Sequence, residues 1–509
     1  MAELVIGLVS ALGTDLNWVY SALETELKAV GHEPKEIRLS AALRDLPPYT
    51  DLPQAPADQY YRTHIAAGDD LCARTKMRHA MAALGVMAIS RERKTLVGDN
   101  LDKLPDAAYI IRSLKRPEEI RMLRSVYGDR FLVMAIYEPK QKRLNTLSDR
   151  IAGSTHETVS AVSRGKAEAL IEIDESESAT GIEAGQNVRD TFHRADLFID
   201  ASTHAHATSS VKRAIELIFG HPSHTPTMDE YGMFLAFGAA KRSADLSRQV
   251  GAAIMDKRGR ILSLGSNEVP KAGGGAYWTN DPGDMRDFQL GHDTSYFRRT
   301  QLLGDVLRRL QDQDWLSTER RETSIEDLVN DALYGEKSTL RDAQLMDVIE
   351  FGRTVHAEML AITEAASRGI AIEGATLYST TFPCHNCARH IVSTGMERVV
   401  YVEPYPKSLA EDLFKDSVVL DPESHGDERV RFEPFVGIGP ELYLDAFTAP
   451  ERKTAKGETL RWVAADAQPK IVKTSPTYPT AEDITRTNFE LALTEAGIYS
   501  SEGERDDEQ

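Results

Sequence analysis

A histidine and two cysteines in the C-terminal half of the chain have the types and spacing of metal ligands. His356 stands two residues before Glu358, and after a predicted helix and strand the chain reads PCHNC over residues 383–387. Cysteines three residues apart at the start of a helix share one face, and helix-terminal amides favour the thiolate form that binds a metal. One imidazole and two thiolates suit zinc, and three protein ligands leave the fourth tetrahedral position open. We therefore predict a catalytic Zn²⁺ held by His356, Cys384 and Cys387.

Glu358 completes this pattern as a candidate for proton transfer. In the first turn of a helix, with the metal over the helix end, Glu358 and His356 can reach the same point. A carboxylate placed there can take a proton from water and pass it to a ring nitrogen and then to departing ammonia, as amidine hydrolysis requires. The pattern H-x-E followed by P-C-x-x-C is similar to the signature of zinc-dependent nucleobase deaminases. We expect Glu358 to be the catalytic proton shuttle.

Three other interpretations of the pattern are open. A C-x-x-C pair can be a redox pair, although such a motif does not need the upstream H-x-E. His385 or His390 could supply a fourth ligand and make a closed structural zinc site, in which case Glu358 would have no role. The residues could also occur together by chance in a protein without a metal.

Length, charge and cysteine content narrow the class of protein. A chain of 509 residues predicts two to four domains, and 41% hydrophobic with 27% charged residues is typical of a globular protein. The net charge of −19 argues against a nucleic-acid polymer as substrate. Three cysteines are too few for a disulfide framework, and neither a basic leader segment nor an apolar run long enough to span a membrane is evident. We expect a cytoplasmic protein.

The first ~215 residues alternate apolar runs with amphipathic stretches, a pattern that predicts an α/β domain with a mostly parallel sheet. A second α/β unit follows HPSHTPTMDE (221–230), whose prolines and polar residues predict a domain boundary. In the first domain the predicted strands are 4–11, 107–114, 131–138, 169–174 and 196–201, and the helices include 14–30 and 117–128. In the second domain the predicted strands are 249–256, 260–267, 375–381, 398–405 and 429–438, and the helices are 227–246, 356–368, one from about 385 and one near 408–416.

We therefore predict domains at 1–220 and 221–450, the second interrupted by a polar insertion at about 271–350. Residues 451–509 are expected to be a weakly patterned extension whose acidic end, SSEGERDDEQ (500–509), is disordered.

The span from about 230 to 448 resembles the cytidine and deoxycytidylate deaminase superfamily, with an α/β/α fold. The whole chain resembles the two-domain bacterial deoxycytidylate deaminases of anti-phage defence, which hydrolyse dCTP to dUTP. Besides the zinc pattern, the segments that carry the resemblance are RSADLSRQVGAAI (242–254), GSNEVPKAGGGAYW (265–278) and RFEPFVGI (431–438). It implies that His356, Cys384 and Cys387 are zinc ligands, that Glu358 is the proton shuttle and that Asn267 contacts the sugar of the substrate.

Asn267 could equally be a plain turn residue that does not contact substrate. Other candidate substrate contacts lie near it in the sequence. The amides of KAGGGAYW (271–278) could wrap a triphosphate with Lys271 supplying charge, or the segment could be a flexible loop. Arg242 and Arg248 are candidate cations for an anionic substrate, or solvated surface charges.

Gly7, Gly13 and Thr14 follow a predicted strand and precede a helix, where a phosphate-binding loop would lie. The spacing departs from the Walker A pattern, because five residues separate the glycines and no lysine precedes Thr14. Residues 110–124 resemble a strand and helix of P-loop nucleotide kinases. We expect a P-loop kinase-like domain that lost catalysis and binds a regulatory nucleotide through Gly7, Gly13 and Thr14. A purely structural docking domain is the alternative.

The leading hypothesis is a zinc-dependent deaminase of free deoxycytidine nucleotides, acting on dCTP and also on dCMP, that depletes the dCTP pool of a phage. A housekeeping dCMP deaminase is the nearest alternative; a nucleic-acid cytidine or adenosine deaminase and a nucleotide kinase with a deaminase-like sensor are further ones. The charge argues against the nucleic-acid editor, and the missing Walker lysine argues against the kinase. By resemblance we also expect a homo-oligomer, with a hexamer among the candidates, dTTP or dCTP as effectors, an inhibitory RNA as partner and no membrane association.

Overall fold

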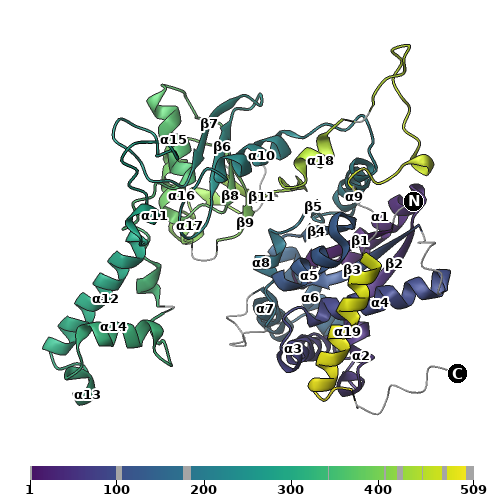
Figure 1. Ribbon diagram of the computed structural model, residues 1–509, viewed down its shortest axis with the longest axis horizontal. Helices are drawn as coiled ribbons and strands as arrows, with labels where there is room; N and C mark the ends of the chain where they lie inside the picture. The colour runs from purple at the N-terminus through teal and green to yellow at the C-terminus, as the bar shows by residue number, and fades with distance from the viewer. Residues whose placement is uncertain are drawn as a thin grey trace. The chain divides into compact units, whose positions relative to one another are not determined.

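The computed structural model of the chain describes residues 3–98, 106–156, 158–175, 185–341, 343–405, 408–420, 428–449, 451–472 and 478–499. These residues form two compact units (Figure 1). Unit 1 consists of Met1–Tyr231 together with Pro434–Gln509, and unit 2 is the intervening Gly232–Glu433. The units differ from the predicted domains, because the chain after unit 2 returns to unit 1 and does not form a separate extension. The predicted disordered end, 500–509, lies outside the described residues.

Unit 1 is built on a six-stranded sheet in the order β12-β5-β4-β1-β3-β2. The pairs among β1 to β5 are parallel, and β12 pairs antiparallel with β5. The mostly parallel sheet predicted for this part of the chain is therefore confirmed. The strands are β1 (Leu4–Ser10), β2 (Glu33–Arg38), β3 (Ala107–Leu114), β4 (Phe131–Tyr137), β5 (Leu197–Asp200) and β12 (Gly437–Ile438).

Helices cover both faces of this sheet, as its buried strands require (Figure 1). On one face, alternate residues of β1 pack with α1 and α9 in a single apolar core, which includes Leu4, Ile6 and Leu8. The helices of unit 1 are α1 (Leu16–Ala29), α2 (Leu39–Arg44), α3 (Ala57–Thr75), α4 (Ala80–Val97), α5 (Pro117–Tyr127), α6 (Lys140–Ser154), α7 (Ala161–Glu175), α8 (Val188–Phe192), α9 (His204–Ile218), α18 (Tyr443–Phe447) and α19 (Tyr478–Glu495).

Three parts of unit 1 differ from the sequence-based expectation. Residues 169–174, predicted as a strand, lie in α7, where Ala167, Leu170 and Ile171 have helical spacing and pack on α6. The edge strand β2 has the charged sequence EPKEIR and was not predicted. The weakly patterned region after 451 contains the 18-residue helix α19. The charged strand β2 lacks apolar alternation, and α19 buries few apolar residues along its length, so neither has a strong periodic signal.

Helix α19 is attached to the start of the first strand of unit 1 through buried charges. The Arg93 guanidinium lies between two carboxylates: Nε is 2.9 Å from Glu3 Oε1 and Nη2 is 2.9 Å from Glu482 Oε1. The hydroxyl of Tyr478 donates to Glu3. Because these side chains are buried, each charge is stabilised by its oppositely charged partner and not by water. The C-terminal helix α19, which supplies Glu482, is therefore part of the fold of unit 1.

Unit 2 has a second six-stranded sheet, in the order β10-β11-β9-β8-β6-β7. Strand β6 is antiparallel to β7 and β8, whereas β8 and β9 are parallel. The predicted single strand at 429–438 is in fact two strands, β11 in this sheet and β12 in the sheet of unit 1. The strands are β6 (Gly251–Met255), β7 (Ile261–Ser266), β8 (Thr376–Thr381), β9 (Arg398–Glu403), β10 (Val418–Val419) and β11 (Val430–Pro434).

The predicted insertion, 271–350, contains several helices. Leu303, Val329, Leu333 and Met346 form a small apolar cluster of their own between its helices. The helices of unit 2 are α10 (Met228–Ala240, which begins in unit 1), α11 (Asp287–Leu290), α12 (Thr294–Asp312), α13 (Thr318–Arg321), α14 (Ile325–Tyr334), α15 (Ala357–Ser367), α16 (His385–Ser393) and α17 (Ala410–Leu413). Among the described residues, no helix combines the length and the apolar character needed to cross a membrane.

Candidate active site

The first turn of α15 carries two of the predicted site residues. His356 is the N-cap residue of this helix, and Glu358 follows in its first turn. The helix lies close against β7 because Gly265 has no side chain: a Cβ there would come within 2.1 Å of the Ala357 carbonyl oxygen. The backbone of β7 therefore fixes the position of the helix end that presents both side chains.

The first turn of α16 carries the two cysteines. Cys384 is the N-cap residue, and Cys387 lies one turn further along the helix. Strand β8 runs directly before this helix, and Ser379 of β8 donates from Oγ to Glu358 Oε1 at 3.3 Å. Two helix N-termini thus bring an imidazole, two thiols and a carboxyl group together, and their amides favour negative charge at this point.

The distances within this group fit a zinc ion. Cys384 Sγ and Cys387 Sγ lie 3.2 and 3.5 Å from His356 Nδ1. Bonds of about 2.3 Å to sulfur and about 2.0 Å to nitrogen in a tetrahedral site would separate such atoms by roughly 3.5 Å. Within the described parts of the chain, His356, Cys384 and Cys387 are the members of the metal-ligand group, and neither His385 nor His390 joins them. These three residues form the zinc-binding triad.

The electrostatics of the group follow from burial and mutual contact. Hydrogen bonding from Cys387, together with the His356 contact, lowers the pKa of Cys384 to about 4. The same contact with Cys384 raises the pKa of His356 to about 9, and the bond to Cys384 raises that of Cys387. Burial raises the pKa of Glu358. Metal binding to such a cluster replaces protons, so zinc affinity and proton release are linked.

A cavity of about 250 Å³ opens over this group. His356, Glu358 and Cys384 form part of its wall, so two of the three triad residues and the candidate proton shuttle face the same space. Much of the remaining wall comes from the segment between β7 and α15, through Asp287, Asp293, Ser295, Arg299, Ile349, Gly352, Arg353 and Thr354. The predicted insertion therefore covers part of the candidate active site.

Three of the described arginines line this cavity. Arg248 Nη1 lies 3.0 Å from Glu403 Oε1, and its guanidinium stacks over the ring of Tyr405. Arg299 of α12 donates to the Met346 carbonyl, and Arg353 donates from Nη1 to the Met285 carbonyl at 2.7 Å. These contacts fix the cations at the wall. Arg248 was among the candidates from sequence, whereas Arg299 and Arg353, in the segment between β7 and α15, were missed because neither belongs to a recognisable motif.

Asn267 lies in the cavity wall and also holds two strands together. Its Oδ1 accepts from the Val250 amide at 2.7 Å, and its Nδ2 donates to the Arg248 carbonyl at 2.8 Å. An amide group can make further hydrogen bonds, so a contact with substrate stays a prediction. Lys271 does not line the described cavity: its Nζ lies 2.6 Å from Asp281 Oδ2.

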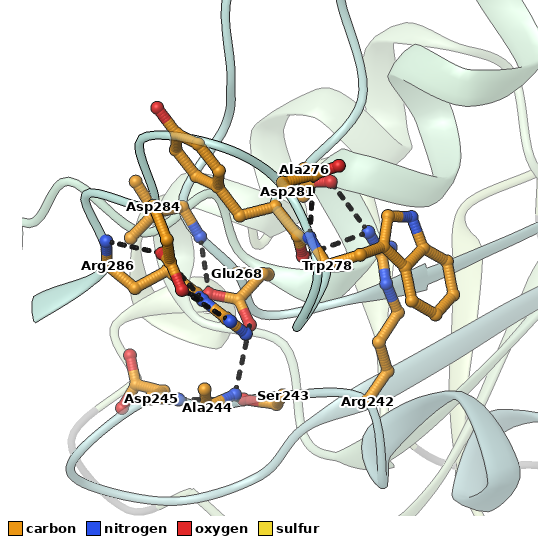
Figure 2. A network of polar contacts seen from close by, with 12 residues as sticks. Arg242, Ser243, Ala244, Asp245, Glu268, Ala276, Trp278, Asp281, Asp284 and Arg286 are labelled. Carbon is orange, nitrogen blue, oxygen red and sulfur yellow. Dashed lines mark hydrogen bonds and ion pairs between the residues drawn. The ribbon is translucent and has the colours of Figure 1, made fainter. Parts of the chain in front are cut away.

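Glu268, next to Asn267, organises the loops beside the cavity (Figure 2). This buried carboxylate accepts from the Ala244 amide at 3.0 Å, and Arg286 lies 3.5 Å from the same oxygen while pairing with Asp284. Ala244 precedes the wall residue Asp245, so Glu268 ties that wall to the start of the insertion. In the same view the candidate cation Arg242 stacks on Trp278, 3.9 Å from the ring centre, and it does not line the described cavity.

The triad, the carboxyl group beside it and the fold around them lie within one matched segment of the chain. Residues 226–403 match the family model of the cytidine and deoxycytidylate deaminase zinc-binding region. This segment is a deaminase zinc-binding domain. The predicted zinc cofactor and the predicted family of this segment are therefore confirmed, whereas the match does not include the chain before residue 226.

Two curated relatives match this chain over short segments. The deoxycytidylate deaminase of Enterobacteria phage T2 is 48% identical over 54 residues, which are 11% of this chain and 29% of the phage protein. ComE operon protein 2 of Bacillus subtilis (strain 168) is 35% identical over 79 residues, 15% of this chain and 42% of the relative. In both cases the chain spans less than half of the relative's length.

A solved structure aligns with part of the chain at low similarity. The crystal structure of dCMP deaminase from the cyanophage S-TIM5 aligns at 17% sequence identity with a TM-score of 0.22. The alignment covers 42% of this chain and 100% of the cyanophage chain.

The predicted phosphate loop of unit 1 has a different geometry from the one expected. Gly7 lies inside β1, where a Cβ would come within 2.5 Å of Leu114, so its absence of a side chain serves strand packing. Gly13 has a φ of +93° in the loop after β1, and a Cβ there would meet the Arg143 carbonyl oxygen at 2.5 Å. Thr14 donates from Oγ1 to the Ala11 carbonyl at 2.8 Å. Gly13 and Thr14 line a cavity of unit 1, and Gly7 does not line it.

Proposed function

We propose that the protein hydrolytically deaminates free deoxycytidine nucleotides, converting dCTP to dUTP and also dCMP to dUMP. The observation that carries this proposal is the grouping of His356, Cys384 and Cys387 beside the buried carboxyl group of Glu358, with His356, Cys384 and Glu358 in the wall of one cavity. The names of the relatives, several of which are deoxycytidylate deaminases, support this substrate class.

The reaction consumes water, forms a carbon–oxygen bond at the 4-position of cytosine and releases the amino group as ammonia. A zinc ion held by the triad would supply a Lewis acid that makes water more acidic. Glu358 can accept one proton from that water and pass it to the ring nitrogen, and then carry the second proton from the added hydroxyl group to the leaving amine. Burial raises the pKa of Glu358, which favours this exchange because its protonated form is more accessible than that of a solvent-exposed carboxyl group. Ser379 Oγ, 3.3 Å from Oε1, orients the carboxyl group.

We assign the phosphate groups of the substrate to the arginines of the cavity wall. Arg248, Arg299 and Arg353 line the wall, and guanidinium groups bind phosphate oxygens through charge-assisted hydrogen bonds. A triphosphate needs more compensating charge than a monophosphate, and two of these arginines come from the segment between β7 and α15. This arrangement supports dCTP as the preferred substrate.

A substrate panel tests the proposal. Ammonia release is measured with dCMP, dCTP, CTP and dATP on one preparation whose zinc content is determined in parallel. We expect about one zinc per chain and the highest kcat/KM with dCTP. Activity on dCMP alone would favour a housekeeping dCMP deaminase, and zinc-loaded protein without activity on any cytidine nucleotide would contradict the proposal.

At the level of the cell, this activity would lower the dCTP pool available to a replicating phage. This step, together with a homo-oligomeric state, dNTP effectors and an inhibitory RNA, rests on the family resemblance. Nucleotide pools measured in cells expressing the protein or its Glu358→Gln variant test the depletion: the dCTP pool should fall only with the unmodified protein.

A further inference from the structure

Unit 1 contains a cavity of about 350 Å³ that the deaminase reaction does not use. Its wall includes the loop after β1, residues of α3 and the segment that follows β3. The loop after β1 lies at the carboxyl edge of a parallel sheet and leads into the 14-residue helix α1. Ligands of α/β domains commonly bind at this edge, where the loop amides and the helix end attract anions.

An internal carboxylate occupies the anion position of this loop. Asp174 Oδ2 accepts from the Leu12 amide at 2.6 Å, and Asp174 Oδ1 lies 2.8 Å from Lys115 Nζ. Asp174 is 1% exposed and comes from α7, far from the loop in sequence. A loop amide and a lysine are also the partners that a phosphate takes in such loops. Asp174 therefore stands where a phosphate would bind, and it has to move for a phosphate to enter.

The same cavity contains buried hydrogen-bond acceptors to which no described donor is bound. Within the described chain, His64 Nε2 and Gln186 Oε1 have no hydrogen-bond partner, although each residue is only 9% exposed. His64 Nδ1 lies 2.8 Å from the Tyr60 carbonyl oxygen and must carry the proton. Burial lowers the pKa of His64, so the ring is neutral and Nε2 accepts. Buried polar atoms without partners are costly, and a ligand with N–H donors would satisfy them.

Aromatic and cationic groups complete the wall. The rings of Tyr60 and Tyr61 belong to it, and flat aromatic faces suit a heterocyclic base. Arg150 is held loosely, 3.4 Å from the Tyr61 hydroxyl and 3.7 Å from Asp15. Its guanidinium can therefore turn toward a phosphate without breaking a short ion pair.

We propose that this cavity is a second ligand site, which binds a free nucleotide when its phosphate displaces Asp174 from the Leu12 amide and Lys115. The N–H groups of the base bond to His64 and Gln186. The site lies in unit 1 and does not depend on the deaminase reaction. It differs from a Walker-type loop because an acidic side chain of the protein competes with the phosphate.

Isothermal titration of the full chain with dATP, dGTP and dTTP tests this site, because none of these probes carries cytosine. We expect at least one probe to bind. Gln186→Leu and His64→Phe should each weaken its binding about tenfold, the effect of one hydrogen bond to a buried acceptor. The matched control Gln141→Leu, on an exposed face of α6, should bind as the unmodified protein does.

Asp174→Asn should tighten binding at least several-fold, because the competing negative charge is gone while the side-chain shape remains. Glu172→Gln, an exposed change on the same helix, is the control for charge alone. Binding of none of the probes to the unmodified protein and to Asp174→Asn would overturn the proposal. The proposal would also be overturned if Gln186→Leu and His64→Phe both bound the probe as tightly as the unmodified protein does. This second outcome tests the proposal even if Asp174→Asn does not fold. Cytidine deamination, assayed separately, reports on unit 2 only.

Discussion

The polar groups that face the two cavities differ in the partners they have within the protein. In unit 2, ligand atoms from two helix ends converge on a point between them and match a zinc ion. In unit 1, the loop amide that could bind an anion is already bound to Asp174, and Lys115 pairs with the same carboxylate. The first arrangement places three metal-ligand atoms around one point, whereas in the second the anion position is filled by a side chain of the protein. The two cavities should therefore respond to different perturbations.

Loss of a sulfur ligand should have the largest effect, and only in unit 2. We expect Cys384→Ser or Cys387→Ser to lose bound zinc and all deamination, because ligand binding and local folding are coupled. Metal analysis with an activity assay measures this. Cys72→Ala, which changes the buried cysteine of unit 1, should retain zinc; unchanged zinc in the ligand variants would show that the triad is wrong.

Glu358→Gln should separate metal binding from turnover. The three ligands remain, so zinc content should stay the same, while kcat falls by about 10²–10⁴ because proton transfer is lost. Glu364→Gln, on the same helix and outside the described cavity wall, is the matched control. Turnover within a few-fold of the unmodified protein would remove Glu358 from the reaction.

Arg93→Met should destabilise unit 1 and leave the zinc triad of unit 2 unaffected. Removing this cation leaves Glu3 and Glu482 buried without it, which typically costs about 3–5 kcal/mol of unfolding free energy. Denaturant unfolding of the full chain should show a destabilised transition of unit 1 with zinc content unchanged. Arg91→Met removes an exposed arginine of the same helix and should shift stability by less than about 1 kcal/mol. Equal effects of the two changes would exclude a structural role for the buried cluster.

The smallest effect is expected at the arginines that line the cavity of unit 2. Arg299→Met or Arg353→Met should raise KM for dCTP about 10- to 100-fold with kcat nearly constant, since a charge-assisted hydrogen bond contributes roughly 1.5–3 kcal/mol. The exposed neighbour Arg298→Met serves as the control. A fall in kcat without a change in KM would place these arginines outside phosphate binding.

The sequence was most informative where chemistry restricts residue type. The ligands His356, Cys384 and Cys387 could be predicted because few side chains bind zinc and their spacing fits helix ends. The cavity wall could not be predicted, because Arg299 and Arg353 belong to no motif and reach the site through the tertiary packing of the segment between β7 and α15. Asp174 illustrates the same limit: its sequence context is an apolar run that suggested a strand, and its contact with Leu12 spans 162 positions.

The chain order of the two units has a consequence for synthesis on the ribosome. Unit 2 is encoded without interruption, whereas unit 1 receives β12 and α19 only after all of unit 2 has emerged. Until then, Arg93 lacks Glu482 and β5 lacks its edge partner. Unit 2, which carries the zinc triad, can therefore fold first, and a truncated product that ends at residue 433 would have a complete unit 2 joined to an incomplete unit 1.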